Sequence, residues 1–589
     1  MNYNKYIKLL LCISVLVCSV VAVKASVPLY TTDIKMSASG EIVLTQKGTC
    51  SIDFYNAETF EMLRSFPLDE TPTGLAIEGD KAYVTTFQSK GHLQVVSTVD
   101  GTILSKVELG SGACAPIFNG DKSKIYVCNQ FSDNVMELDA ASLKVLRTVK
   151  VLREPKSVVV SPNGKNLYVT NFLPAQRADL DVVNSAVSVI DIAGFTKIKD
   201  IPLSNGSNAL RGMCITPDGK YVFVSHNLGR FTVPTSQLQQ GWMNTSAFSI
   251  IDTEKQDYVG VILVDEPDRG AAGIWSIECD ENNVYISHSG THEISVIDHK
   301  AMLDRFDKYP DKSKMDYDLR FLYGLRKRVK LEGNGPRAIL LAGDKLYAPT
   351  YFADKLNVLD VKTTAVKSFD LNPEREESVV DRGERYFNDA MNCFQSWQSC
   401  NGCHPGDGRT DGMNWDLTND GLGNSKNCKS LLLSNQTPPA MISGIRPSAH
   451  YAVGTGFKYI QFFEPTEEIQ NSVAEYMTSL KPVPSPYLVD GQLSAKALEG
   501  RKVFEKLKCD ECHTGAYYTD MKMHVIGDDV EFERGWDTPT LIEVWRTAPY
   551  LFDGRAATMR EVFEVHKHGV TKKLKEAELD ALVEYVNSL

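Results

Sequence analysis

The stretch that predicts the fold of this chain is Leu167-Tyr168-Val169-Thr170-Asn171, a run of large apolar side chains that ends in polar ones. Similar stretches are Ile42–Thr45, Ala82–Thr85, Ile125–Cys128, Val222–Ser225, Val284–Ser287 and Leu346–Pro349. The first four stretches lie 40, 43 and 42 residues apart, and the later spacings widen to 55, 62 and 62. Short strands that recur about every forty residues are typical of a β-propeller. These seven stretches predict seven blades, with loop insertions in the later ones.

The surroundings of these stretches also favour strands. Turn signals such as Pro162-Asn163-Gly164 and Pro217-Asp218-Gly219 precede several of them. In most units a second strand follows and ends in aspartate, as in Ser188–Asp191 and Ser249–Asp252. A parallel β-solenoid is less consistent with spacings this long and variable. We therefore expect an all-β seven-bladed propeller over residues 26–370.

The quoted stretch matches the motif that defines YVTN-type propellers, and the chain resembles that family over most of residues 30–370. The resemblance implies the fold. It implies almost nothing about function, because one fold supports many functions.

The N-terminus has the features of an export signal. Lys5 and Lys8 precede an apolar run, Leu9–Val23, and Val23-Lys24-Ala25 offers a small-residue cleavage site. The run is short for a membrane span, and no second span follows. We expect residues 1–25 to be a cleaved signal peptide and the protein to be periplasmic.

Composition limits the partners and the number of domains. At 589 residues the chain is too long for one ordinary core. Its net charge is −12, and loss of the predicted signal peptide would bring it to about −15, which disfavours nucleic acid and anionic membranes. A small basic redox protein that donates electrons, or a neutral partner, suits such a surface better.

Two further motifs carry chemistry. Cys400-Asn401-Gly402-Cys403-His404 and Cys509-Asp510-Glu511-Cys512-His513 both read CxxCH, the attachment signature of c-type haem. In each, the two thiols form thioethers with one porphyrin and the histidine lies under the iron. A zinc site would need two more ligands nearby, and a redox dithiol would not need the histidine. We therefore predict two covalently bound haems.

The context of the two motifs repeats. A helix with Gly and then an aromatic residue precedes each motif, as in Gly383-x-x-x-Phe387 and Gly500-x-x-x-Phe504. An amphipathic helix follows some seventy residues later, over Glu467–Leu480 and Lys575–Leu589. We expect two all-α cytochrome c domains in tandem, over residues 374–482 and 490–589.

The region from about 375 to 589 resembles the di-haem cytochrome c peroxidase and MauG-type family. The matching residues include Cys512–Gly515, Tyr518–Asp520, Asp537–Leu541 and Thr547–Thr558. In that family the N-terminal haem reacts with peroxide and the C-terminal haem handles electrons. The distal ligand of the second iron follows the Asp-Gly-Arg segment, where this chain has His566, which fits the spacing best, and His568 as the alternative.

The first haem unit departs from the family. Members place a catalytic glutamate after a Gly-Arg segment, but Gly444–His450 holds no carboxylate. Arg446 and His450 are the candidate catalytic residues, and His450 offers either an acid/base near neutral pH or an iron ligand. Met413 and Met441 are further candidate ligands, and Trp415 and Trp397 are candidate electron relays or core residues.

Other polar groups leave alternatives open. His226, His288 and His292 lie at related blade positions and are either a metal or haem-facing cluster or polar loop residues; no carboxylate or cysteine accompanies them at matching spacing. Calcium between the haem units is known in the resembled family, and Asn427 and Thr538 offer oxygen ligands. Seven cysteines belong to neither motif nor signal, so their pairing is open: Cys50, Cys114, Cys128, Cys214, Cys279, Cys393 and Cys428.

These features predict a periplasmic di-haem oxidoreductase that reduces hydrogen peroxide with electrons from a small redox protein, without nucleic acid or a stable membrane span. Two rivals remain: MauG-type oxidation of a partner protein, and a non-enzymatic electron carrier with a propeller scaffold. A propeller dehydrogenase that uses the haems as acceptors would need metal at His226, His288 and His292.

Overall fold

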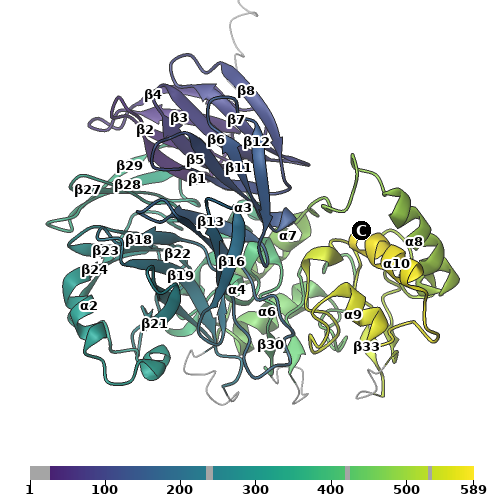
Figure 1. Cartoon of the computed structure of the whole chain (residues 1–589). Helices are drawn as coiled ribbons and strands as arrows, with labels where there is room; N and C mark the ends of the chain where they lie inside the picture. The colour runs from purple at the N-terminus through teal and green to yellow at the C-terminus, as the bar shows by residue number, and fades with distance from the viewer. Residues whose placement is uncertain (1–26, 234–242, 418–424, 528–532) are drawn as a thin grey trace, which may run out of the picture.

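The computed structural model describes residues 27–233, 243–417, 425–527 and 533–589 (Figure 1). The predicted signal peptide, residues 1–25, lies outside these residues. No helix in the described part of the chain is long and apolar enough to cross a membrane.

The N-terminal part is a seven-bladed β-propeller, as predicted. Each blade is an antiparallel meander, and the seven repeated stretches form the second full strand of each blade. Blade 1 consists of β1 (Thr31–Met36), β2 (Ile42–Gln46), β3 (Ser51–Tyr55) and β4 (Met62–Pro67), and blade 2 consists of β5 (Pro72–Glu78), β6 (Lys81–Phe87), β7 (Gly91–Ser97) and β8 (Ile103–Leu109). Blade 3 consists of β9 (Ala113–Phe118), β10 (Lys124–Asn129), β11 (Asn134–Asp139) and β12 (Val145–Lys150), and blade 4 consists of β13 (Pro155–Val160), β14 (Asn166–Asn171), β15 (Ala186–Asp191) and β16 (Thr196–Pro202).

The later blades carry the insertions. Blade 5 consists of β17 (Ser207–Asn208), β18 (Met213–Ile215), β19 (Tyr221–Gly229), β20 (Asn244–Asp252) and β21 (Asp257–Leu263). Blade 6 consists of β22 (Ile274–Cys279), β23 (Asn283–His288), β24 (Glu293–Asp298) and β25 (Arg326–Lys330). Blade 7 consists of β26 (Leu340–Ala342), β27 (Lys345–Pro349), β28 (Lys355–Asp360) and β29 (Val366–Asp370). In blade 6 the helix α2 (His299–Asp307) and the 3-10 turn η4 (Lys312–Tyr317) are inserted between two strands, which explains one widened spacing.

Burial explains why the repeated stretches are so apolar. Strand β14 is buried on both faces because neighbouring blades pack against it, whereas the fourth strand β12 alternates between exposed and half-buried residues. Phe223 and Phe248 pack between blades 5 and 6 with ring centres 5.5 Å apart. Burying such a side chain stabilises the fold by roughly 1.5–3 kcal/mol.

The first strands of the blades contact one another in a ring around the propeller axis. The ring closes where β1 meets β26, and each blade uses consecutive strands only. At this closure the amide of Leu29 donates to the carboxylate of Asp354, 3.1 Å away.

The C-terminal region is mainly helical and forms two similar units, called here the first and second helical units. The first holds α3 (Val379–Asn388), α4 (Cys400–Cys403), α5 (Pro405–Gly408), α6 (Ala449–Tyr459) and α7 (Glu467–Ser479); the second holds α8 (Ala495–Lys506), α9 (Met559–Glu564) and α10 (Glu576–Asn587). Each unit has a two-stranded hairpin, β30 (Asn414–Trp415) with β31 (Lys426–Asn427), and β32 (Met523–His524) with β33 (Trp536–Asp537). The short turns η2 (Gln130–Ser132), η5 (Ala390–Asn392), η6 (Phe394–Ser396), η7 (Cys509–Glu511) and η8 (Val544–Arg546) complete the described elements.

The glycines noted in the sequence allow the helices of each unit to cross closely. A Cβ on Gly383 would lie 1.9 Å from the carbonyl oxygen of Ser472, and one on Gly500 would lie 1.8 Å from that of Ala581. The aromatic residues four positions later pack the same crossings, with Phe387–Tyr476 and Phe504–Tyr585 ring centres both 5.3 Å apart.

Two of the unassigned cysteines meet between blades 5 and 6. The Sγ atoms of Cys214 and Cys279 are 3.5 Å apart, and a disulfide needs them about 2 Å apart. We predict that oxidised glutathione will link them, with both thiol hydrogens passing to two molecules of reduced glutathione. Peptide mapping without reductant should show this pair, and the melting temperature should rise because the bond restricts the unfolded chain.

The variant Cys279→Ser is the control and should neither cross-link Cys214 nor gain stability. Recovery of both cysteines as separately alkylated peptides after oxidation would contradict the prediction.

Candidate functional site

The two cysteines of the first CxxCH motif lie on α4, and His404 follows the end of this helix. All three residues line a cavity in the first helical unit. His404 Nδ1 donates a hydrogen bond to the carbonyl oxygen of Arg409, 3.1 Å away. Burial lowers the pKa of His404 to about 4, so the ring is neutral at neutral pH. The hydrogen bond fixes the ring and leaves Nε2 available as an iron ligand.

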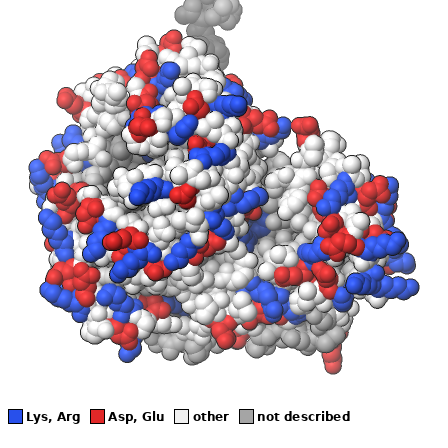
Figure 2. Space-filling model, viewed as in Figure 1, with Lys and Arg blue, Asp and Glu red and all other residues white. Residues whose placement is uncertain are grey.

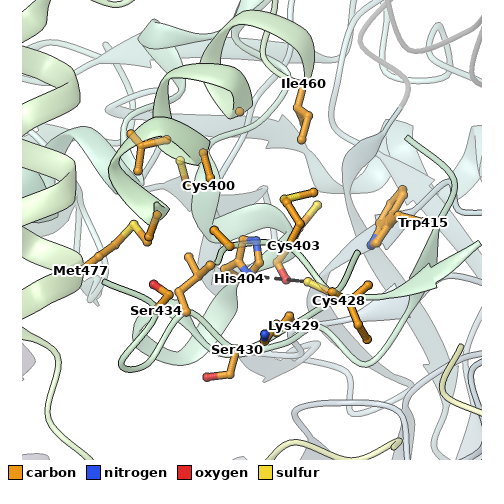
Figure 3. A pocket seen from close by; sticks show the side chains of 18 of the residues that line it. Cys400, Cys403, His404, Trp415, Cys428, Lys429, Ser430, Ser434, Ile460 and Met477 are labelled. Atoms are coloured by element: carbon orange, nitrogen blue, oxygen red, sulfur yellow. Dashed lines mark hydrogen bonds between the residues drawn. The ribbon is translucent and has the colours of Figure 1, made fainter. Parts of the chain in front are cut away.

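The cavity beside this motif has a volume of about 250 Å³. Cys400, Cys403 and His404 line it together, and Met477 approaches it from α7 (Figure 3). Most of the remaining lining is apolar and includes Phe387, Leu431, Leu432, Val453, Phe457 and Ile460. Two thiols and one neutral imidazole on the wall of an apolar cavity fit a covalently attached porphyrin.

The second motif repeats the same local geometry. His513 Nδ1 donates to the carbonyl oxygen of Tyr518 at 3.1 Å, which corresponds to the bond made by His404. The ring of His568 faces the ring of His513 with centres 6.4 Å apart. An iron between two imidazole nitrogens, with bonds of about 2 Å each, places the ring centres roughly 6 Å apart. The pair therefore fits a two-histidine iron site.

His566, which the spacing favoured, has a different environment. Its Nε2 donates to the carbonyl oxygen of Arg555 at 3.2 Å. Because the ring of His568 lies against that of His513 and the Nε2 of His566 is bonded to Arg555, the geometry favours the second of the two predicted ligands.

The two helical units differ at this position. They match elsewhere: the bridge Ala440–Arg446 corresponds to Tyr550–Ala556, and the left-handed Met441 (φ 73°) corresponds to Leu551 (φ 70°). Beyond that point α9 ends at Glu564 and the chain turns through His566 and His568, whereas α6 continues to Tyr459. At the same offset the first unit has Gly456 and Lys458, so no histidine corresponds to His568.

The predicted residues of the first site are only partly brought together. His450 is exposed, its Nε2 donates to Asn471 Oδ1 at 2.7 Å, and it is not among the residues that line the cavity. Arg446 lies over the ring of Tyr451 at 5.9 Å and is also outside the lining.

Of the candidate methionines and tryptophans, Met441 and Trp415 line the cavity. Met413 is buried beside the propeller, where Asn208 contacts its sulfur at 3.7 Å. Trp397 is buried and donates to Gln395 Oε1 at 3.1 Å.

Sequence reasoning missed two polar residues near this cavity. Gln461 lines it and donates to Cys400 Sγ at 3.1 Å. Asp411 accepts from the indole nitrogen of Trp415 at 2.9 Å, and burial raises the pKa of Asp411 to about 7. The carboxyl of Asp411 can therefore gain or lose a proton near neutral pH. No motif marked Asp411, because its signal is its burial.

The propeller histidines have complete hydrogen bonds of their own. His226 donates to Asn227 O (2.9 Å) and accepts from Ser249 (2.7 Å); His288 donates to Ala271 O (2.7 Å) and accepts from Ser295 (2.8 Å). His292 donates to Asp389 Oδ1 at 3.0 Å, which joins the propeller to the first helical unit. These bonds favour a structural role for all three histidines.

The two candidate calcium ligands, Asn427 and Thr538, form hydrogen bonds within the protein. Asn427 donates from its backbone to Phe552 O at 2.7 Å, and the Thr538 hydroxyl donates to Lys522 O at 3.1 Å. A possible metal group in the described part of the chain is Cys512, Asp520 and His524, but Cys512 is also a predicted thioether residue.

A buried ion network joins the three parts of the chain. Arg409 makes two bonds of 2.9 Å to Glu543, which also pairs with Arg546 at 3.4 Å. Arg546 in turn pairs with Glu154 of the propeller at 3.4 Å. All four side chains are at most 6% exposed. Burial would raise the pKa of Glu154, but Arg546 and Arg153 outweigh it and lower that pKa.

Known proteins similar to this chain include subunits of one enzyme. No family model matches the chain. Hydrazine synthase subunit gamma of Kuenenia stuttgartiensis is 27% identical over 36% of this chain and 78% of its own length. Subunit beta of the same organism is 28% identical over 35% of this chain and 53% of its own length. Uncharacterized protein YncE of Salmonella typhimurium is 32% identical over 16% of this chain and 26% of its own length.

A solved structure of Kuenenia stuttgartiensis hydrazine synthase superposes on this chain with a TM-score of 0.52 and 22% sequence identity. The superposition covers 59% of this chain and 99% of that chain. This likeness supports the fold alone. The chain is thus a seven-bladed propeller with a mainly helical C-terminal region, related to hydrazine synthase subunits and to YncE.

The ion network yields a stability prediction. The substitution Glu543→Gln leaves two buried arginines short of negative charge, so we expect a loss of about 3–5 kcal/mol and a lower melting temperature by circular dichroism. The control Glu505→Gln removes an exposed pair with Arg501 and should cost at most about 1 kcal/mol. Equal melting temperatures for the two variants would contradict the prediction.

Proposed function

We propose that this chain is an exported di-haem c-type cytochrome oxidoreductase, in which a small molecule reacts at the first haem and the second haem transfers electrons. The observation that carries the proposal is the difference between two otherwise matching units. A histidine, His568, faces the attachment histidine in the second unit, whereas the corresponding positions of the first unit hold Gly456 and Lys458. Haem supplies one-electron redox chemistry and an iron that binds a small molecule on an open face.

The chain's own residues have distinct tasks in this proposal. Cys400 and Cys403 hold the first haem, Cys509 and Cys512 hold the second, and their histidines are the proximal ligands. The apolar lining of the first cavity would surround the porphyrin and keep water away from it.

Proton movement near the first cavity falls to polar groups beside it. Gln461 offers an amide at the attachment thiol Cys400. Asp411, one hydrogen bond behind Trp415, holds or releases a proton near neutral pH because its pKa is about 7.

Two substrates are candidates. The resemblance to di-haem peroxidases favours hydrogen peroxide, although His450 lies outside the cavity lining and no carboxylate lines the cavity in the described residues. The relation to subunits of hydrazine synthase favours a small nitrogen compound and a role inside a multi-subunit redox complex. Oxidation of a partner protein, as in MauG-type enzymes, is the remaining enzymatic alternative.

The surface suits an electron partner of mixed charge. The face in Figure 2 carries lysine and arginine side chains interspersed with aspartate and glutamate. A small redox protein that docks on such a surface would rely on paired contacts of both signs, and its association rate would fall only moderately with salt. Export by the signal peptide, and hence a periplasmic location, belongs to the same proposal.

The ligand of the second haem can be tested with two neighbouring histidines. His568→Ala should convert the electron paramagnetic resonance signal of one ferric haem from low spin to high spin, because the second axial nitrogen is removed. His566→Ala is the matched control and should keep the low-spin signal. The reverse result would make His566 the ligand.

The reacting haem can be tested on the unmodified protein. We expect one high-spin and one low-spin ferric signal, with the high-spin signal removed by its substrate. Hydrogen peroxide and hydroxylamine should be added separately, since a response to only one identifies the substrate class. Two low-spin signals that neither compound changes would refute the enzymatic proposal and leave an electron carrier.

A further inference from the structure

Four cationic side chains gather at one end of the propeller axis, on the side that the first helical unit covers. Lys156 lies on β13, Arg211 lies between β17 and β18, Arg337 precedes β26, and Lys47 follows β2. Arg211 reaches the helical unit by donating to Asn401 Oδ1 at 2.7 Å. We call these four residues the axial cation cluster.

Aromatic rings separate the members of the cluster. Lys156 and Arg211 lie 5.5 and 5.7 Å from the ring centre of Phe172. Arg211 and Arg337 lie 4.4 and 4.2 Å from that of Trp275.

The arrangement continues past Arg337. Arg337 lies 4.0 Å from the ring centre of Tyr351, whose hydroxyl accepts from Lys47 at 3.4 Å. Cations and rings thus alternate in one continuous arc. Such contacts stabilise each cation but bring no formal negative charge to it.

The cluster lacks direct ion pairs. Among the described residues, no carboxylate forms a salt bridge with any of its four members. Arg211 is only 8% exposed, donates to neutral oxygens, and has a buried Nε without an acceptor. Burial, and then repulsion from Arg337, lower the pKa of Arg211 to about 9, and burial lowers that of Lys156. An isolated buried charge is costly, so the site favours an added anion.

Two carboxylates of the first helical unit face the same region without closing it. Burial would raise the pKa of Asp407, but Lys47 and Arg337, with Arg409 and Arg546, lower it to about 2. Burial raises the pKa of Glu384. Lys47 and Asp407 are both exposed to solvent. Four cations lie near the three carboxylates of Asp407, Glu384 and Glu154, so cationic groups outnumber the acidic groups around the cluster.

We propose that the axial cation cluster binds a small oxyanion of the phosphate or carboxylate class. The planar forks of Arg211 and Arg337 suit two oxygens of such an anion, and Lys156 supplies a point charge. None of the four residues lines the cavity of the first haem unit, so this site is separate from the proposed reaction.

The test uses the full-length protein with its haems, freed of multivalent anions in a chloride buffer. Inorganic phosphate, sulfate and succinate are titrated separately by calorimetry at constant ionic strength. We expect saturable binding of at least one, at one site, with a rise in melting temperature. Absence of saturable binding for all three anions would overturn the proposal.

The key variant is Lys156→Met, because the Lys156 ammonium makes no hydrogen bond or ion pair in the described structure. It should melt higher than the unmodified protein without anion, and it should bind the anion at least tenfold more weakly. Arg211→Gln should also weaken binding, while Arg64→Gln is the control, since Arg64 is paired with Glu41 at 2.7 Å elsewhere on the propeller. Unchanged affinity in Lys156→Met and Arg211→Gln would place the anion elsewhere and refute the assignment.

Discussion

The architecture depends on the buried ion network Arg409–Glu543–Arg546–Glu154. Its members come from the first helical unit, the second helical unit and the propeller, so one set of charges joins all three parts of the chain. Buried pairs of this kind contribute little net stability compared with apolar packing, but removal of one partner is severe. The network therefore acts mainly by excluding other arrangements of the three parts. Arg409 also lies five residues after His404 and accepts its ring hydrogen bond, which links the docking of the units to the orientation of a candidate iron ligand.

The difference between the helical units is the basis for assigning different roles to them. Both have the same glycine-mediated helix crossing, the same hydrogen bond from the motif histidine and the same left-handed turn. The two units differ in the length of one helix: α6 continues to Tyr459, whereas the corresponding helix α9 ends at Glu564. The earlier end of α9 and the histidine at position 568, where the first unit has Lys458, bring a second imidazole to the motif histidine His513.

The sequence was sufficient for the propeller because each blade repeats one local pattern, and buried second strands such as β14 leave an apolar signature. The helix crossings at Gly383 and Gly500 were visible for the same reason. The choice between His566 and His568 was not, since it depends on where α9 ends and how the chain turns. Asp411 and the axial cation cluster were also invisible, because their properties arise from burial and from residues far apart in sequence. The peroxidase resemblance of the C-terminal region stays a prediction.

The closure of the propeller ring has a consequence for how the protein forms. No blade shares strands from both ends of the propeller, so the first blade meets its last neighbour only when residues near Leu29 contact Asp354, 325 positions away. Loop-closure entropy makes such distant contacts slow to form. During synthesis the open edge of blade 1 stays without its neighbour until blade 7 has been made. Six of the blade interfaces thus join blades that follow one another in the sequence, and the seventh joins the first blade to the last.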